Sequence, residues 1–185
     1  MDLALTERNG LPDALRALVE AYPREGWEAH PNYSQLIAFW LDRHLMFRRL
    51  MAELLSDAEE ALDRQVDPTR YKARLSRFGG MLINQLHGHH QIEDAHYFPV
   101  MSGLDQGVAR GFDILDADHH ALDGILADLT EKANGVLMAE ADRREKTAKL
   151  HKALVAFDPL LDRHLVDEEE LVVPVLLKYD PEQFR

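Results

Sequence analysis

Apolar side chains recur at steps of three and four residues along most of the chain after residue 33. This is the period of an amphipathic α-helix, and no stretch alternates apolar and polar residues as a half-buried β-strand does. The pattern predicts four long helices, at about residues 33–63, 68–101, 108–134 and 139–179. Gly135 is placed to end the third of them. Because short connections between long helices favour antiparallel neighbours, we expect an all-α fold, an up-down-up-down four-helix bundle.

Residues 1–33 precede this pattern and are predicted to be an N-terminal extension of the bundle. Leucines at helical spacing follow Pro12, which indicates a short amphipathic helix starting near that residue. Prolines and a glycine then interrupt the pattern, at Pro23, Gly26 and Pro31. The predicted bundle domain therefore comprises residues 34–180.

The second half of the bundle repeats the first half after 75 positions without a gap. The matched residues that carry chemistry or break helices are His44 with His119, His89 with His164, Glu93 with Glu168 and Pro99 with Pro174. Apolar positions keep the same offset, among them Phe47 with Leu122, Met51 with Leu126 and Leu86 with Leu161. Each half thus carries one lone histidine and one His-x-x-x-Glu pair.

This repeat predicts a site inside the bundle. In His-x-x-x-Glu the two side chains lie one turn apart on the same helix face, and the lone histidines lie on the apolar stripes of their own helices. Burying two carboxylates and four imidazoles is very costly unless cations compensate them. A carboxylate bridges two metals whereas an imidazole serves one, so we predict two ions of iron, manganese or zinc. The predicted ligands are His44, His89, Glu93, His119, His164 and Glu168.

Composition narrows the alternatives. The chain has no cysteine, which excludes disulfides, thiolate zinc sites and Fe–S clusters. A net charge of −12 argues against a nucleic-acid partner. No apolar run approaches the ~18 residues of a membrane span, and the acidic start does not resemble a signal peptide. We therefore expect a cytoplasmic protein without a membrane partner.

Four segments resemble the hemerythrin family, including its HHE cation-binding members. They are His44-Leu-Met-Phe, His89-His-Gln-Ile-Glu93 with Tyr97-Phe98-Pro99, Asp118-His119-His-Ala-Leu122, and His164-Leu-Val-Asp-Glu168-Glu169 before Pro174. The resemblance covers about residues 34–178. It implies a four-helix bundle around two non-heme iron ions, bridged by an oxo or hydroxo oxygen and two carboxylates. It also implies chemistry with dioxygen, peroxide, nitric oxide or iron itself.

The chain departs from the oxygen-carrying hemerythrins in its third and fourth helices. Their third helix supplies His-x-x-x-His, and matching His119 to the second of these places Leu115 at the first. If His120 is matched to the second histidine instead, the residue at the first position is again not a histidine. Their fourth helix spaces His and Asp five apart, which here selects Glu169. The repeat favours His119 and Glu168, an arrangement similar to a subgroup associated with peroxide or redox chemistry.

Two residues that follow Glu93 have more than one interpretation. His96 lies three positions later, and α-helical spacing places it on the same face. It is a candidate fifth nitrogen ligand, a proton donor beside the site, or a paired core histidine. Its repeat mate is Leu171, which disfavours a ferritin-type Glu-x-x-His site. Tyr97 is a candidate hydrogen-bond donor to an oxygen ligand of the metals, or a packing residue.

The remaining histidines of the predicted site region are expected to lie away from the metals. His120 is turned about 100° from His119 and is expected beside the site or at the surface. His87 and His90 lie off the metal stripe of their helix. We expect them to face solvent or to pair with Asp94.

Three functions are compatible with this pattern. The first is a protein that binds or senses a small diatomic ligand, peroxide or iron at the two-metal site. The second is an enzyme that decomposes peroxide or oxidises ferrous iron there. The third is a metal-free helical interaction module. The first is the prediction, for a monomer or a homodimer.

Overall fold

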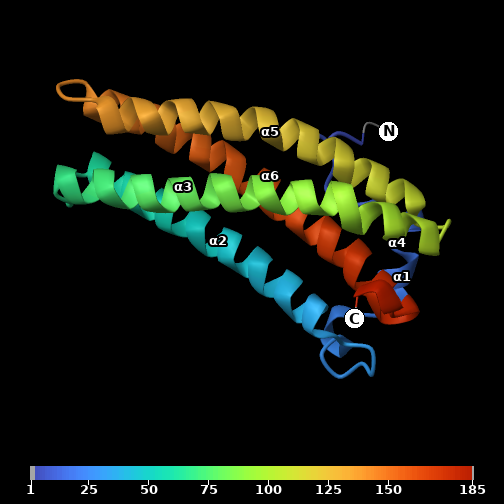
Figure 1. Cartoon of the computed structure of the whole chain (residues 1–185). Coiled ribbons are helices and arrows are strands. Elements are labelled where there is room, and N and C mark those ends of the chain that lie inside the picture. The colour runs from blue at the N-terminus through green and yellow to red at the C-terminus, as the bar shows by residue number, and fades with distance from the viewer. Residues whose placement is uncertain (1–2, 185) are drawn as a thin grey trace. The chain divides into compact units, whose positions relative to one another are not determined.

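The computed structural model of the chain describes residues 3–184, which are mostly helical and contain no strand. The elements, most of them labelled in Figure 1, are η1 (Asp13–Leu15), α1 (Ala17–Ala21), η2 (Arg24–Gly26), α2 (Gln35–Leu62), α3 (Pro68–Ile92), η3 (Glu93–Tyr97), α4 (Phe98–Leu104), α5 (Ala109–Met138), α6 (Arg143–Tyr179) and η4 (Glu182–Phe184). The predicted all-α class is confirmed. In the described part of the chain, no helix has both the length and the apolar character that crossing a membrane requires.

The four long helices contribute to two compact units. The first unit comprises residues 3–45, 90–120 and 162–184, and the second comprises Met46–His89 and Ala121–Leu161. Six apolar repeat mates form part of the core of the second unit, and all are buried: Phe47, Met51, Leu86, Leu122, Leu126 and Leu161. The apolar stripes predicted from the repeat therefore face the interior.

Side-chain caps determine where two of the long helices begin. The Ser34 hydroxyl accepts a hydrogen bond from the backbone N–H of Ile37 at 3.3 Å, at the start of α2. One carboxylate oxygen of Asp67 accepts from the N–H groups of Thr69 and Arg70, at 2.9 and 3.0 Å, at the start of α3. These first-turn donors have no partner within the helix, so the caps satisfy them locally.

Two predicted helix boundaries are wrong. The stretch 68–101 is not one α-helix, because the π-helical turn η3 separates α3 from α4, and the N–H of Phe98 bonds the carbonyl of Glu93. A π-turn closes with an i→i+5 bond, so the residues after it no longer come round to the face that α-helical spacing predicts. Gly135 does not end α5, which continues to Met138. An isolated helical glycine costs only about 1 kcal/mol.

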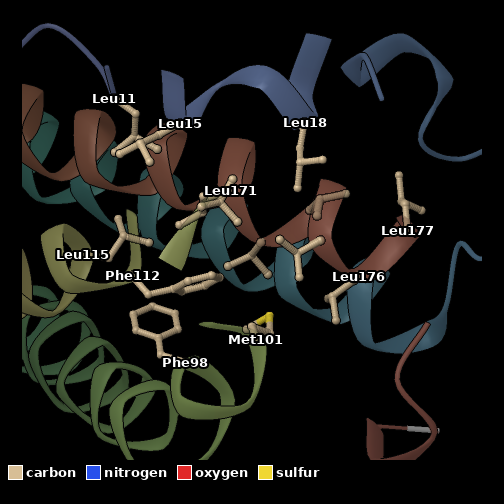
Figure 2. Close-up of a cluster of buried hydrophobic side chains, with 14 of the residues drawn as sticks. Leu11, Leu15, Leu18, Phe98, Met101, Phe112, Leu115, Leu171, Leu176 and Leu177 are labelled. Atoms are coloured by element: carbon tan, nitrogen blue, oxygen red, sulfur yellow. The ribbon is translucent and has the colours of Figure 1, made fainter. Parts of the chain in front are cut away.

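The N-terminal segment, residues 3–33, belongs to the first unit. Its short elements η1 and α1 follow Pro12, close to the predicted start. Leu11, Leu15 and Leu18 are buried in one apolar cluster with residues of α4, α5 and α6. Figure 2 shows these leucines lying along α6, with Leu171 directed into the same cluster. Burial of three leucines contributes several kcal/mol, at about 1.5–3 kcal/mol each, to holding the segment in place.

A leucine side chain of α6 lies close to the backbone of α5 at Gly111 in this cluster. A Cβ added there would lie 2.8 and 2.9 Å from the two Cδ atoms of Leu171, which is fully buried. Gly111→Ala is therefore expected to lower the free energy of unfolding by about 1–2 kcal/mol, since overpacking outweighs the gain in helix propensity. Urea denaturation measures the change.

Gly124 in the same helix is the matched control. An added Cβ there meets nothing within 4 Å. Gly124→Ala should stabilise the protein by up to about 1 kcal/mol through helix propensity alone. Equal effects of the two substitutions would contradict the close approach at Gly111.

Candidate metal centre

Five of the six predicted ligands are buried in the first unit. Their exposed fractions are 0% for His44, His164 and Glu168, 1% for Glu93 and 2% for His119. The sixth, His89, is half-buried and ends the first segment of the second unit, where it is joined to His90 within α3. Burial of so many ionisable groups together is the costly arrangement that the repeat predicted.

One donor group combines imidazoles with both predicted carboxylates. Its members each offer one ligand atom, all within 4.8 Å of one another: His44, His89, Glu93 and Glu168. His44 comes from α2 and Glu168 from α6, whereas Glu93 begins the π-turn one helical turn after His89. These side chains are close enough together to hold a metal ion.

A second donor group consists of three imidazoles, those of His90, His119 and His164. The rings of His90 and His119 stack with centroids 4.0 Å apart, and the ring of His164 meets both edge-on at 5.2 and 4.9 Å. All three are buried. The expectation that His90 faces solvent is therefore wrong. Its spacing of three from Glu93 is also a helical contact spacing.

Carboxylate oxygens lie opposite the Nε2 atoms of three of these histidines. Glu168 lies between two of them, with Oε1 3.1 Å from Nε2 of His44 and Oε2 3.4 Å from Nε2 of His164. Oε2 of Glu93 lies 3.6 Å from Nε2 of His119. Glu168 thus faces nitrogen atoms of both donor groups.

A second set of carboxylates holds the opposite nitrogen of each ring. The Nδ1 atoms of the three histidines meet carboxylate oxygens in the pairs His44–Glu169 at 3.0 Å, His119–Asp94 at 2.7 Å and His164–Asp118 at 3.3 Å. Asp94 and Glu169 are repeat mates. A carboxylate on Nδ1 fixes the ring and leaves Nε2 for a metal, as in most histidine metal sites. Glu169 is therefore placed to orient a ligand and lies outside the donor groups.

The electrostatics of the site favour bound cations. Burial raises the pKa of Glu93 well above its ordinary value, and the nearby Glu168 raises it further. Burial alone would lower the pKa of His164, but the hydrogen-bonded carboxylate of Asp118 and the nearby carboxylate of Glu168 raise it to about 9. The pKa of His44 is also raised, because Glu168 and Glu169 outweigh burial. Without bound cations, these raised pKa values favour protonation of Glu93, His44 and His164.

The donor atoms fit transition-metal ions. The Nε2 atoms of His119 and His164 are buried and have no hydrogen-bond partner among residues 3–184. An orphaned buried nitrogen is costly, and a metal bond satisfies it. Imidazole with carboxylate suits iron, manganese or zinc better than magnesium or calcium. The residues present therefore fit the group that the sequence predicted.

Three other residues of the region lie outside the donor groups. His96 is exposed, so the expected shared face with Glu93 is wrong, because the π-turn changes the helical period between them. His120 is exposed, and its Nδ1 lies 2.8 Å from the backbone oxygen of Asp116. The ring of Tyr97 packs edge-on against a tryptophan, Trp40, at 5.1 Å.

A comparison with known families agrees with this site. The family model described as Hemerythrin HHE cation binding domain matches residues 35–176. The chain belongs to this family. Searches of curated proteins and of solved structures returned no match.

The residues matched by the family model include both donor groups and the carboxylates that meet their Nδ1 atoms. The N-terminal segment lies before the matched residues, so the family model does not include its contacts with the site. Cation binding is the property that the family name and the geometry of the chain share.

Proposed function

We propose that this hemerythrin-like protein holds two non-heme iron ions and binds or senses a small ligand there, such as dioxygen, nitric oxide or peroxide. One ion would be held by the three-imidazole group, and the other by His44 and His89. Glu93 and Glu168 would contribute an oxygen to each. The observation that carries the proposal is the position of Glu168 between nitrogens of both groups.

The donor count supports different roles for the two ions. Three imidazoles and two carboxylate oxygens would nearly fill the coordination of the first ion. The second ion would have one imidazole fewer, which would leave a position for a small ligand. His90 would thus supply the third imidazole of this group, which Leu115, at the family's histidine position, does not provide. When bound, the iron pair supplies reversible ligand binding and redox chemistry, and the protein orients the rings and excludes water.

The antiparallel up-down order of the helices is part of the same proposal. Within the second unit, α2 ends at Leu62 and α3 begins at Pro68, so a short turn joins them. α5 ends at Met138 and α6 begins at Arg143 after a similarly short connection. Connections this short favour antiparallel neighbours.

His90→Ala tests the assignment of ligands. Purified wild-type protein loaded anaerobically with ferrous iron should contain about two ions per chain, and the variant about one, because the three-imidazole group loses a ligand. Metal analysis gives the count, and near-ultraviolet charge-transfer bands after air oxidation report the oxygen-bridged pair. His87→Ala is the matched control, since His87 lies one turn earlier, is exposed and meets Asp123 at 3.2 Å.

Distinct results would overturn the proposal or change its class. Fewer than one ion in the wild-type protein would contradict it and leave a helical interaction module. A spectrum that changes reversibly when dioxygen is removed and readmitted supports ligand binding. Oxygen evolution from peroxide that is lost in Glu168→Ala would instead assign a peroxide-decomposing enzyme.

A further inference from the structure

The N-terminal segment places a buried arginine behind the metal centre. Arg8 is 6% exposed. Its guanidinium donates to Asp118 Oδ1 at 2.7 Å and to the other Asp118 oxygen, and its Nε donates to Asp167 Oδ2 at 3.0 Å. Asp118 lies on α5 and Asp167 on α6, so a single side chain holds carboxylates of two helices. A two-pronged arginine–carboxylate bond fixes the carboxylate in direction as well as in position.

The carboxylate that Arg8 holds also orients a predicted ligand. Asp118 Oδ2 lies 3.3 Å from Nδ1 of His164, whose other nitrogen faces the site. Arg8, Asp118 and His164 therefore form a continuous chain of contacts from the segment to the three-imidazole group. The repeat does not supply an equivalent, because the position that matches Asp118 is Arg43.

A second arginine of the segment reaches the other donor group. Arg24 Nη1 donates to Glu169 Oε2 at 2.6 Å, and Oε1 of Glu169 meets Nδ1 of His44 at 3.0 Å. The side chain of Arg24 is 46% exposed, so this pair is weaker than the buried one at Arg8. Two separate arginines of one segment thus contact the carboxylates behind two predicted ligands on different helices.

We propose that residues 3–33 are a positioning element of the metal centre, in which Arg8 and Arg24 set the orientation of His164 and His44 through Asp118 and Glu169. The buried leucines of the segment hold these arginines in place (Figure 2). The inference rests on the proposed function, because the oriented rings are the proposed ligands. Docking of the segment thereby controls how tightly the metals are held.

Arg8→Gln tests this coupling through metal affinity. Competition of the ferrous protein with a chelator should show affinity lowered by about 10- to 100-fold, the usual effect of losing a group that orients a metal-bound histidine. The charge-transfer bands of the oxidised protein should shift or weaken. Arg16→Gln is the matched control: Arg16 pairs the same segment with the same helix, through Glu170 at 3.1 Å, without touching either orienting carboxylate. It should leave both readouts unchanged.

Two additions make the result specific. Asp118→Asn in the Arg8→Gln background should add little further loss, because both substitutions break one chain of contacts. If Arg8→Gln does not fold, the half-exposed Arg24→Gln replaces it and should lower affinity severalfold. Wild-type protein that takes up two ions, with Arg8→Gln or Arg24→Gln of equal affinity and spectrum, overturns this inference alone. Wild-type protein that takes up none overturns the proposed function.

Discussion

Glu93→Gln is expected to abolish metal binding and at the same time to stabilise the metal-free protein. Glu93 is 1% exposed, and burial together with the nearby Glu168 raises its pKa well above the ordinary value. For an acid this shift means that the folded metal-free state binds its proton more tightly than the unfolded state. Stability that is present at low pH is therefore lost as the pH rises above the ordinary value of 4.5.

Glutamine has nearly the same shape and carries no charge, so it removes this penalty. Its amide keeps a hydrogen-bond donor, as a protonated carboxyl group has, for a nearby carboxylate. At pH 7 we expect the free energy of unfolding of the metal-free variant to rise, because the neutral amide does not carry the cost of burying a carboxylate. Metal content should fall from about two ions per chain to fewer than one, since an amide is a poor bridging ligand.

Chemical denaturation of metal-free protein and metal analysis of loaded protein measure the two effects. Glu131→Gln, at an exposed position of α5, is the control and should change neither. A variant that is less stable without metal, or that still holds two ions, would show that Glu93 is an ordinary partner of the core and not a bridging ligand.

The sequence predicted most of the residues gathered at this site, but it did not predict the π-turn or the Arg8 contacts beside it. The 75-residue repeat selected five residues that are now seen buried together, because a periodic helical pattern determines which side chains share an interior. The repeat also distinguished between two adjacent histidines, because it selected His119, which is buried, and not His120, which is exposed. The repeat could not indicate His90, because its mate in the second half is Leu165, an ordinary core leucine. The informative sign was Leu115, which left one imidazole to be supplied from another helix.

Two further features depended on information that no local pattern contains. Pro99 follows the π-turn at Glu93–Tyr97, but its repeat mate Pro174 lies within the continuous helix α6, so the proline alone does not mark the turn. The turn leaves His96 exposed. Arg8 lies 110 positions from Asp118, and only the folded chain brings them together. Its burial was also unexpected from composition, because arginine is rarely buried unless it is paired.

Metal affinity is expected to rise steeply with pH between 7 and 9. In the metal-free protein, the hydrogen-bonded Asp118 and the nearby Glu168 carboxylate overcome burial and raise the pKa of His164 to about 9, against an ordinary value of 6.5. A metal binds only the neutral ring nitrogen, so it must displace this proton. One displaced proton gives about a tenfold gain in affinity per pH unit well below this pKa, and roughly 50-fold from pH 7 to 9, because the gain levels off as the pH reaches the pKa.

Zinc competition against a chelator at pH 7, 8 and 9 measures the affinity, corrected for protonation of the chelator. Calorimetry at pH 7 in two buffers of different ionisation enthalpy counts the protons, and at least one should be released per chain loaded. An affinity that stays constant from pH 7 to 9, with no proton released, would exclude His164 as a ligand.

The same pKa gives the opposite dependence for the metal-free fold. The raised pKa of His164 contributes stability that is complete below pH 6.5 and is lost as the pH rises through about 9. Glu93 acts in the same direction from its ordinary value of 4.5 upward, because its pKa is also raised in the folded state. The metal-free protein should therefore become less stable over the range in which metal binding becomes stronger. Denaturation curves of the two forms should diverge as the pH increases, whereas parallel curves would mean that metals and protons do not compete for the same buried atoms.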